Sequence, residues 1–366
     1  MAARETPLLE AHRRLGARLT EFAGWTMPLQ YEGVVTEHRA VRSHAGVFDV
    51  SHLGKLRLSG SRARAALERA LTVDLAALEA GRAAYGFVLQ DDGGCLDDVF
   101  VYRLGESQWL VVPNAGNVAV VKDALRAAGA TDVEDAWDRW AILALQGPSS
   151  TAAFESVWPS RAVSKLKLHT WTAVEELGGD GFVARTGYTG ERGYELYVAW
   201  AHAEAAFQRL LDAGCTPAGL GARDTLRLEM GYALHGHELG PEINPIEAGL
   251  GGAIAWNQPF RGREALLTVR GSGPSRSLFG VRCSSPGVPR RGCEVVAGES
   301  VVGEVTSGNF SPSVGTGIAL ALGRAPVPDP GEEVAIKVRG RLIEGAIVKP
   351  PFIERASPET SSQVHK

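Results

Sequence analysis

Three short strand-like runs between residues 85 and 113 constrain the fold of this chain more than any other feature. The runs are YGFVLQ, LDDVFVYRL and QWLVVP, and they are joined by the turn sequences DDGG and GES. Aspartate–glycine turns between apolar runs are a strong signal for a β-hairpin. The segment therefore predicts three consecutive strands of an antiparallel sheet.

The runs around this segment predict helices on one side of the sheet. LLEAHRRLGA and VVTEHRAVRSHAG, within a helical pattern from Thr6 to Gly46, each end at a glycine that could cap a helix. Ser61 is a possible N-cap of the helix SRARAALERAL, and a helix over Val118–Ala128 precedes a strand over Ala141–Leu145. The order is neither a regular strand–helix alternation nor all-β. It favours an α+β fold with mixed antiparallel sheets.

The C-terminal part of the chain differs from the rest. Six apolar runs broken by glycine and proline predict a small β-sandwich or β-barrel: LFGVRC, CEVVAG, VGEVTSG, IALALG, EEVAIKV and LIEGAIV. The sequence GSGPSRS at 271–277 is typical of a linker. We therefore expect an α+β region over residues 1–272, a β domain over 278–353 and a disordered polar tail over 354–366.

Charge and composition exclude several classes of protein. The formal net charge of −4 argues against a surface for nucleic acid. The apolar stretches are too short to span a bilayer, and the N-terminus has no signal-like apolar core, so we expect a cytoplasmic protein with no membrane partner. Cys95, Cys215, Cys283 and Cys293 lie far apart, which favours free thiols over disulfides or a metal site.

Asp97 and Asp98 stand in the middle strand of the three, although aspartate is depleted in strands. Because successive side chains point to opposite faces, Asp98 shares a face with Phe100 and Tyr102, whereas Asp97 points the other way. A buried carboxylate needs a partner or a functional reason, and at most one of the two can join a buried site. The alternation does not say which face is inside, and two solvated turn aspartates remain the alternative.

The stretch RTGYTGERGYEL could form a pocket for a flat heterocycle. Its part GYTGERGYE contains three glycines and two tyrosines, and Glu191 and Glu195 lie beside this aromatic-lined turn. Tyrosine rings could stack on such a ligand, and a carboxylate could accept its N–H groups. A glycine-rich hairpin with surface tyrosines is the alternative.

Arg223, in PAGLGARDTLRLEM, is placed near the start of a predicted helix. Its guanidinium could meet a carboxylate in a two-point fork, or it could pair with the adjacent Asp224. We expect Arg227 and Glu229 to form structural ion pairs of that second kind. The glycines before Arg223 match no nucleotide-binding spacing. The chain also lacks a recognisable nucleophile or metal motif, which favours an enzyme whose soluble co-substrate brings the reactivity.

Seven blocks of the sequence resemble, in order, the T-protein family of the glycine cleavage system, the tetrahydrofolate-dependent aminomethyltransferases. The blocks are TPLLEAHRRLGARLTEFAGWTMPLQY, AGVFDVSHLGKLRLSG, GGCLDDVFVYRL, LALQGPSS, RTGYTGERGYEL, PAGLGARDTLRLEMGYALHGHEL and EVTSGNFSPSVGTGIALALG. The resemblance extends from about residue 6 to 353. It implies a three-lobed folate-binding aminomethyltransferase fold, in which two intertwined subdomains within residues 1–272 precede a C-terminal β-barrel.

The resemblance implies an enzyme that transfers the methylene carbon of an aminomethyl group from the lipoyl arm of H-protein to tetrahydrofolate. The products are 5,10-methylenetetrahydrofolate, ammonia and dihydrolipoyl H-protein. Tetrahydrofolate is then a co-substrate, and no metal or nucleotide is needed. The implied partners are lipoylated H-protein and, more loosely, the other glycine cleavage enzymes.

By the same resemblance, Asp98 is the catalytic carboxylate, buried beside the folate nitrogens, and Asp97 lies on the outer face. Tyrosine rings would pack on the folate rings, Glu195 would accept hydrogen bonds from the pterin, and Arg223 would meet the glutamate tail. The residues implied to line the folate cavity are Tyr85, Asn114, Tyr188, Glu195, Arg223 and Tyr232.

The sequence departs from the family pattern at two places. Gly251-Gly252 stands where members often carry a tryptophan, and Leu166–His169 lacks the tyrosine of some members, so no folate contact is assigned there. Three alternatives remain: a folate-dependent demethylase of the same fold, a folate-binding protein of iron–sulfur cluster maintenance, and a binding module without catalysis. The second resembles the chain less, because PFRGREAL lacks the cysteine of its motif.

Overall fold

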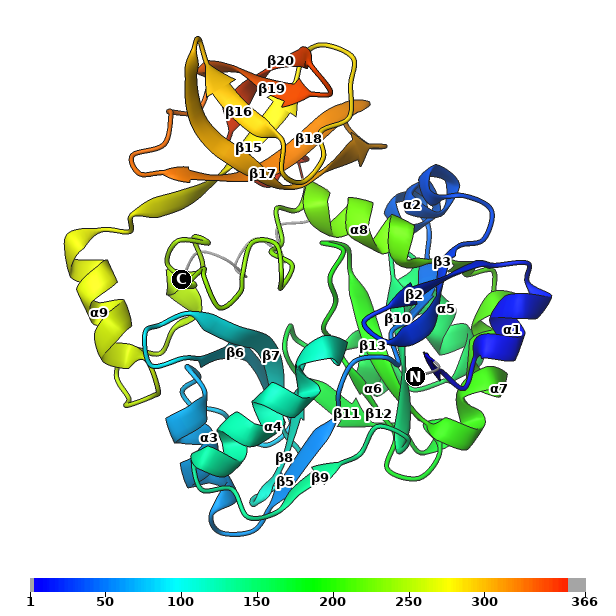
Figure 1. The fold of residues 1–366 in the computed structure, drawn as a ribbon. Helices are drawn as coiled ribbons and strands as arrows, with labels where there is room; N and C mark the ends of the chain where they lie inside the picture. Colours follow the sequence, from blue (N-terminus) through cyan, green and yellow to red (C-terminus); the bar gives the residue numbers. More distant parts are fainter. Residues whose placement is uncertain (1–2, 355–366) are drawn as a thin grey trace. The chain divides into compact units, whose positions relative to one another are not determined.

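The computed structural model of the protein describes residues 3–354 (Figure 1). Two compact units are each assembled from two stretches of the chain: residues up to 86 with 99–223, and residues 87–98 with those from 224 onward. Three elements pass from one unit into the other: strands β6 (Ala83–Leu89) and β7 (Cys95–Arg103) and helix α8 (Leu220–Glu229). Apart from Glu354, the predicted polar tail lies outside the described residues.

The first unit mixes helices with three sheets, which confirms the predicted α+β class. Its helices are α1 (Leu9–Arg14), α2 (Val34–Ser43), α3 (Ala63–Ala70), α4 (Val118–Ala127), α5 (Ser150–Val157), α6 (Arg161–Ser164), α7 (Ala203–Asp212) and the short turns η1 (Ala115–Asn117), η2 (Glu175–Leu177) and η3 (Trp200–His202). Its strands besides β6 and β7 are β1 (Arg4–Glu5), β2 (Arg18–Phe22), β3 (Trp25–Gln30), β4 (Gly46–Asp49), β5 (Leu56–Ser59), β8 (Gln108–Val112), β9 (Val133–Asp135), β10 (Trp140–Gln146), β11 (Trp171–Ala173), β12 (Phe182–Ala184), β13 (Gly193–Ala199) and β14 (Thr216–Pro217).

The predicted meander of three strands is confirmed. β6, β7 and β8 are neighbours in a five-stranded sheet of order β6-β7-β8-β5-β9, with Phe100 opposite Val112. The turn DDGG begins at Asp91 and places Gly93 at φ 89°, a conformation that glycine adopts without steric cost.

A six-stranded sheet of order β11-β12-β13-β10-β4-β14 forms the centre of the first unit. Every residue of β10 is buried, as expected for a strand covered on both faces. One face packs against α5 and α7 through an apolar cluster that includes Leu143, Leu196, Phe154 and Phe207. The other face of the sheet is therefore free of these helices.

The sequence pattern predicts a helical N-terminal segment, but the structure shows that this segment is only partly helical. Between α1 and α2 lies a hairpin of β2 and β3, in which Phe22 is opposite Trp25. Its turn residues Ala23 and Gly24 have φ 49° and φ 79°. Positive φ at both central positions is the geometry of a type I′ turn, which alanine rarely adopts. The sequence Ala-Gly therefore gives no hairpin signal.

The C-terminal domain is a closed six-stranded barrel of order β15-β18-β17-β16-β19-β20, yellow to red in Figure 1. Its pairings are antiparallel, and its interior is apolar. The sequence predicted a sandwich or a barrel, and the structure shows the barrel. The second unit also holds α9 (Arg263–Ser272) and η4 (Gly251–Ala253), and its strands are β15 (Arg276–Cys283), β16 (Glu294–Ala297), β17 (Ser300–Ser311), β18 (Thr316–Arg324), β19 (Glu333–Val338) and β20 (Arg341–Val348).

The linker predicted at 271–277 is shorter than expected. Helix α9 continues to Ser272 and β15 already begins at Arg276, so only residues 273–275 connect them. Gly273 ends the helix at φ 80°, in the left-handed region that glycine favours after a helix.

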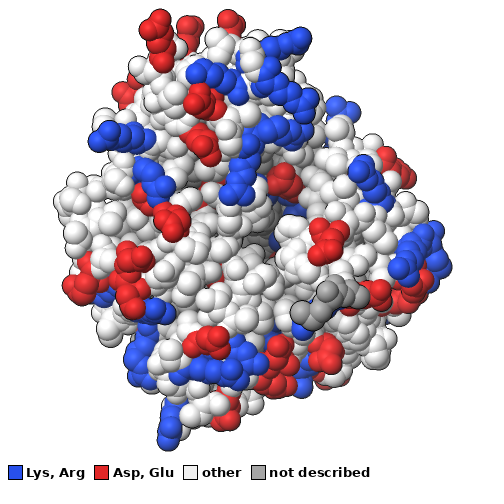
Figure 2. All heavy atoms as spheres, in the orientation of Figure 1, with Lys and Arg blue, Asp and Glu red and all other residues white. Residues whose placement is uncertain are grey.

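Within residues 3–354, no helix combines the length and the apolar character needed to cross a bilayer. On the face of the molecule drawn in Figure 2, acidic and basic side chains are interspersed.

A buried polar network ties the N-terminal segment to β4. The Thr6 hydroxyl donates to Asp49 Oδ2 at 2.6 Å, and His12 Nε2 lies 3.0 Å from the same oxygen. The backbone N–H of Ser51 donates to Asp49 Oδ1, and the Tyr31 hydroxyl lies 2.9 Å from His12 Nδ1. Burial by itself would raise the pKa of Asp49, but its hydrogen bonds and the nearby His12 lower that pKa to about 2.

We expect Asp49→Asn to lower the free energy of unfolding at pH 7 by about 2 kcal/mol. Because the folded pKa of Asp49 lies below its unfolded value, the stabilisation is present above pH ~4 and is lost as the pH falls toward 2. Urea unfolding followed by tryptophan fluorescence between pH 7 and pH 2.5 measures the difference. Asp123→Asn, at an exposed ion pair with Arg126, is the control and should change little. An equal loss at both ends of the pH range would contradict this account.

Candidate active site

The structure corrects the expected positions of the two aspartates in β7. Asp97 is fully buried on the face that also holds Val99 and Val101, whereas Asp98 and Phe100 are half-buried on the opposite face. The alternation itself is confirmed, but the expectation that Asp98 is the buried carboxylate and Asp97 the outer one is wrong. Asp98 keeps part of its surface accessible, so its carboxylate can meet a ligand that enters from that face.

The aromatic neighbours of Asp98 on β7 form part of a ring cluster. Tyr85 packs on Phe100 with ring centroids 5.6 Å apart, and His169 meets Phe100 edge-on at 5.4 Å. Tyr85 is half-buried. The segment 166–169, to which no ligand contact is assigned above, therefore brings a histidine to this cluster in place of a tyrosine.

His169 has an unusual backbone and a neutral ring. Its φ is 58°, which is uncommon for a residue other than glycine and points to a constraint from the surrounding structure. Burial, together with the charge of Arg82, lowers the pKa of His169 to about 4. At neutral pH the ring is therefore uncharged, and it can pack against Phe100 without the cost of a buried charge.

Glu195 lies on the face of the central sheet that is free of α5 and α7. It is opposite Ala144 of β10 and Ala184 of β12, and these small side chains leave room for its carboxyl group. The Thr186 hydroxyl donates to Glu195 Oε2. Burial raises the pKa of Glu195, although Thr186 and the charge of Arg223 act in the opposite direction.

The glycine-rich turn before Glu195 is held by the side chain of Gln146. Thr189 donates to Gln146 Oε1 at 2.8 Å, and Gln146 Nε2 donates to the carbonyl of Thr186 at 3.3 Å. A Cβ at Gly187 or Gly193 would come within 2.3 Å of the Gln146 side chain. The glycines are thus required for close packing, and the turn presents Tyr188 in a fixed place. Glu191 differs from Glu195, because it pairs with Arg42 at 2.8 Å.

Arg223 lies beside Tyr188 rather than in an ion pair with Asp224. Its guanidinium carbon is 4.8 Å from the centroid of the Tyr188 ring, within the range of a cation–π contact. Its Nη1 is buried and has no hydrogen-bond partner among the described residues. The positive charge of Arg223 and the carboxyl group of Glu195 also interact. The first unit therefore brings together three of the predicted residues, which are Tyr188, Glu195 and Arg223.

The expected structural ion pair is formed by Arg227. This buried side chain contacts Asp224 at 2.8 Å and Glu238 at 3.2 Å, and it donates to Ser307 in the barrel. The ion-pair role expected for Glu229 stays a prediction. Glu229 accepts hydrogen bonds from serine hydroxyl groups, which are those of Ser311 and Ser313.

The last two predicted residues occupy separate places. Asn114 is half-buried two residues after β8, and its carbonyl accepts from the N–H of Asn117, the last residue of η1. Tyr232 belongs to the second unit, where its carbonyl accepts from Arg227 at 3.2 Å. Their roles toward a ligand stay predictions.

Sequence reasoning did not single out His52, in the turn after β4. The side chain is buried, and its Nδ1 has no hydrogen-bond partner among the described residues. A single histidine in SHLG has no spacing that marks it, so only the fold reveals its burial.

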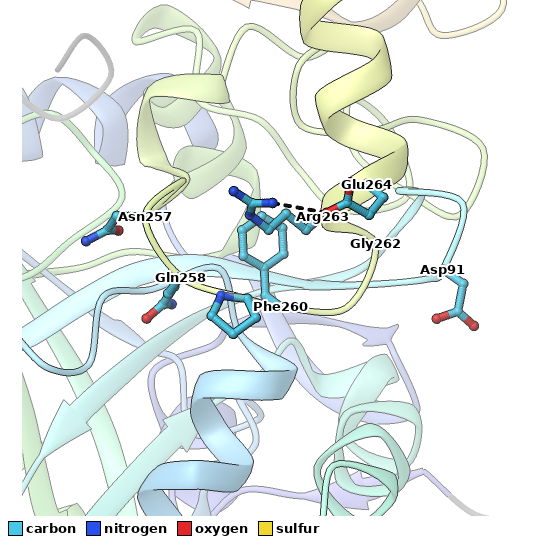
Figure 3. A pocket seen from close by; sticks show the side chains of 8 residues that line it. Asp91, Asn257, Gln258, Phe260, Gly262, Arg263 and Glu264 are labelled. Carbon is cyan, nitrogen blue, oxygen red and sulfur yellow. Dashed lines mark hydrogen bonds and ion pairs between the residues drawn. The ribbon is translucent and has the colours of Figure 1, made fainter.

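A separate cavity of about 490 Å³ lies in the second unit (Figure 3). It is lined by Asp91, Asn257, Gln258, Pro259, Phe260, Gly262, Arg263 and Glu264. Arg263 Nη1 lies 3.0 Å from Glu264 Oε1, an ion pair drawn as a dashed line in Figure 3. The lining includes none of the residues predicted to act on a ligand.

Comparison with known proteins places the chain in a family. The family model "GCVT N-terminal domain" matches residues 8–258, and "Glycine cleavage T-protein C-terminal barrel domain" matches residues 276–354. The chain belongs to the glycine cleavage T-protein family. The closed barrel of β15–β20 corresponds to the second of these matches.

Relatives of this T-protein family member match it over nearly their whole length. An aminomethyltransferase of Halothermothrix orenii is 42% identical over 96% of this chain and 100% of its own. One of Mycobacterium leprae is 44% identical over 95% and 96%. The crystal structure of the glycine cleavage system aminomethyltransferase T from Bartonella henselae, 35% identical, superposes with a TM-score of 0.90 over 96% of this chain and 98% of its own. The chain is thus an enzyme, an aminomethyltransferase of the T-protein fold.

We expect Glu195→Gln to raise the melting temperature of the ligand-free protein by a few degrees at pH 7. The folded pKa of Glu195 lies above its unfolded value, so the ionised carboxyl destabilises the folded state at neutral pH. The gain should disappear below pH ~4, where the carboxyl is protonated in both states. Calorimetry at pH 7 and pH 4 measures it. Glu191→Gln, which breaks the pair with Arg42, is the control and should not stabilise the protein. A lower melting temperature for Glu195→Gln at pH 7 would refute the prediction.

Proposed function

We propose that this T-protein family member transfers the methylene carbon of the aminomethyl group on the lipoyl arm of H-protein to tetrahydrofolate. The carbon–sulfur and carbon–nitrogen bonds of the aminomethyl thioether break, and two nitrogen–carbon bonds form. Tetrahydrofolate loses two N–H protons. One becomes the thiol hydrogen of dihydrolipoyl H-protein, and the other becomes the third hydrogen of ammonia. The other product is 5,10-methylenetetrahydrofolate, and no oxidant or reductant is required.

The group of Tyr188, Glu195 and Arg223 carries this proposal. A buried carboxyl group can accept hydrogen bonds from the amino and ring N–H groups of a pterin, and a tyrosine ring can pack on its flat face. The unpartnered Nη1 of Arg223 leaves a buried donor for an acceptor on the ligand. Tetrahydrofolate fits this set of donors and acceptors, and it supplies the two nitrogens that take up the one-carbon unit. Tyr85, Asn114 and Tyr232 are proposed to complete the lining.

Asp98 is proposed as the catalytic carboxylate. Positive charge develops on the one-carbon unit as ammonia leaves, and a carboxylate at that place would stabilise it and could accept a proton. Positioned acid–base help of this kind contributes roughly 10²–10⁴-fold to a rate. The half-buried state of Asp98, on the same face of β7 as Phe100, supports this role better than the buried state of Asp97 would.

We further propose that lipoylated H-protein is the donor in the cytoplasm, with the other glycine cleavage enzymes as loose associates. The functional division into a region over 1–272 and a barrel domain over 278–353 is likewise proposed. The aminomethyltransferase names of the relatives support the donor, because the same reaction requires an aminomethyl carrier.

The decisive assay combines the purified protein, aminomethyl-loaded lipoylated H-protein and tetrahydrofolate. We expect release of ammonia together with an equal amount of 5,10-methylenetetrahydrofolate. Free aminomethyl-lipoate without H-protein is the control for the donor. If tetrahydrofolate binds but ammonia release stays at the uncatalysed rate, the transferase proposal fails. A demethylase would instead form a one-carbon product from a methylated donor.

We expect Asp98→Asn to lower kcat by roughly 10²–10⁴-fold and to leave the dissociation constant for tetrahydrofolate largely unchanged. Asparagine keeps the size of the side chain but removes its charge and its ability to accept a proton. Steady-state kinetics and titration calorimetry separate the two effects. Asp97→Asn is the matched control. Because Asp97 is fully buried, its substitution should lower the melting temperature. The loss of kcat should be much smaller than for Asp98→Asn. Equal losses of kcat in the two variants would contradict the assignment.

A further inference from the structure

His52 is buried with one ring nitrogen unsatisfied. Only 3% of its surface is exposed, and its Nδ1 has no hydrogen-bond partner within residues 3–354. A buried polar atom without a partner destabilises the folded state, so each such atom in a folded protein calls for an explanation. Burial, with the positive charge of Arg223, lowers the pKa of His52 to about 3. The imidazole is thus neutral at physiological pH.

The turn that carries His52 is held rigidly. The N–H of Gly54 donates to the carbonyl of Pro113 at 2.9 Å, and the indole N–H of Trp137 donates to the carbonyl of His52 at 3.2 Å. The Phe22 ring meets the imidazole edge-on at 5.5 Å. The ring therefore has fixed neighbours. Loose packing of the turn does not explain why its Nδ1 has no partner.

Another unsatisfied atom is Nη1 of Arg223, a residue whose positive charge acts on His52 and which therefore lies near it. The turn of His52 is hydrogen-bonded to Pro113, which directly precedes Asn114. Arg223 and Asn114 are both residues of the proposed folate site. Two buried hydrogen-bonding atoms near one proposed site are readily explained if a bound molecule satisfies them.

We propose that His52 is a further positioning residue of the folate site, whose Nδ1 acts with Arg223 Nη1 to hydrogen-bond the polar part of the bound folate or a water molecule that the folate traps. This inference rests on the proposed function. A neutral imidazole suits the place, because it can offer a hydrogen bond without repelling the neighbouring guanidinium.

If His52 contacts the bound folate, its effects on stability and on binding differ. In the ligand-free protein the unsatisfied Nδ1 destabilises the fold, so an apolar side chain of similar size should be tolerated or stabilising. With folate bound, the same atom makes a hydrogen bond, so its removal should weaken binding. A residue with a packing role alone would show the opposite pattern, with a lower melting temperature and unchanged affinity.

The test measures tetrahydrofolate binding by titration calorimetry and melting temperatures with and without tetrahydrofolate. We expect His52→Leu to weaken binding about three- to tenfold, the range of one net hydrogen bond, with an unchanged or higher melting temperature when ligand-free. His52→Asn, which keeps a polar atom near the position of Nδ1, should restore much of the affinity. Phe22→Leu, which changes only the packing against the imidazole, should leave affinity unchanged.

A double-mutant cycle with Arg223→Gln tests whether the two residues act together. The loss caused by His52→Leu should shrink when Arg223 is already replaced, because both serve the same ligand group. Wild-type affinity in His52→Leu, or strictly additive losses in the cycle, would overturn the inference while leaving the proposed function intact. Failure of the wild-type protein to bind tetrahydrofolate would overturn both.

Discussion

The Glu195 carboxyl group is buried on one face of the central sheet, and much of the neighbouring sequence is arranged around it. Ala144 and Ala184 are small where they stand opposite it. The Thr186 hydroxyl donates to it, and the Gln146 side chain fixes the turn that leads to it. An ionised group in such a place lowers stability unless it is paired. A ligand with N–H groups would offset this loss of stability, because its hydrogen bonds would complete the pairing of the carboxyl group.

Glu195 shares this incomplete pairing with Arg223 and His52. Each is buried at least in part and lacks full compensation from the protein itself: Glu195 through its raised pKa, the other two through an unsatisfied nitrogen. Buried polar groups are normally satisfied, and a ligand in the proposed site would satisfy these three. By contrast, the buried Asp49 receives hydrogen bonds on both oxygens and fixes structure.

The sequence predicted elements whose signals are local. Apolar runs with Asp-Gly turns gave the strands β6–β8, and runs broken by glycine gave the barrel. The β2–β3 hairpin was missed, because its turn places Ala23 at a positive φ that the residue type does not suggest. Alternation correctly separated Asp97 from Asp98, but the choice of the buried face depends on long-range packing, and the expectation for it was wrong. His52 carries no local signal, since the residues that contact its turn and ring, Pro113, Trp137 and Phe22, come from other parts of the chain.

Asp97 then needs an explanation different from the one for Asp98. Its side chain is fully buried between apolar neighbours on β7, so no dissolved substrate reaches it without a change in structure. Its neighbour in sequence lies on the accessible face because a strand must alternate. Two adjacent carboxylates in one strand can therefore hold two separate functions, one in the stability of the sheet and one at the ligand. If both aspartates faced the ligand, their charges would repel and one pKa would rise. The strand avoids this conflict by its geometry alone.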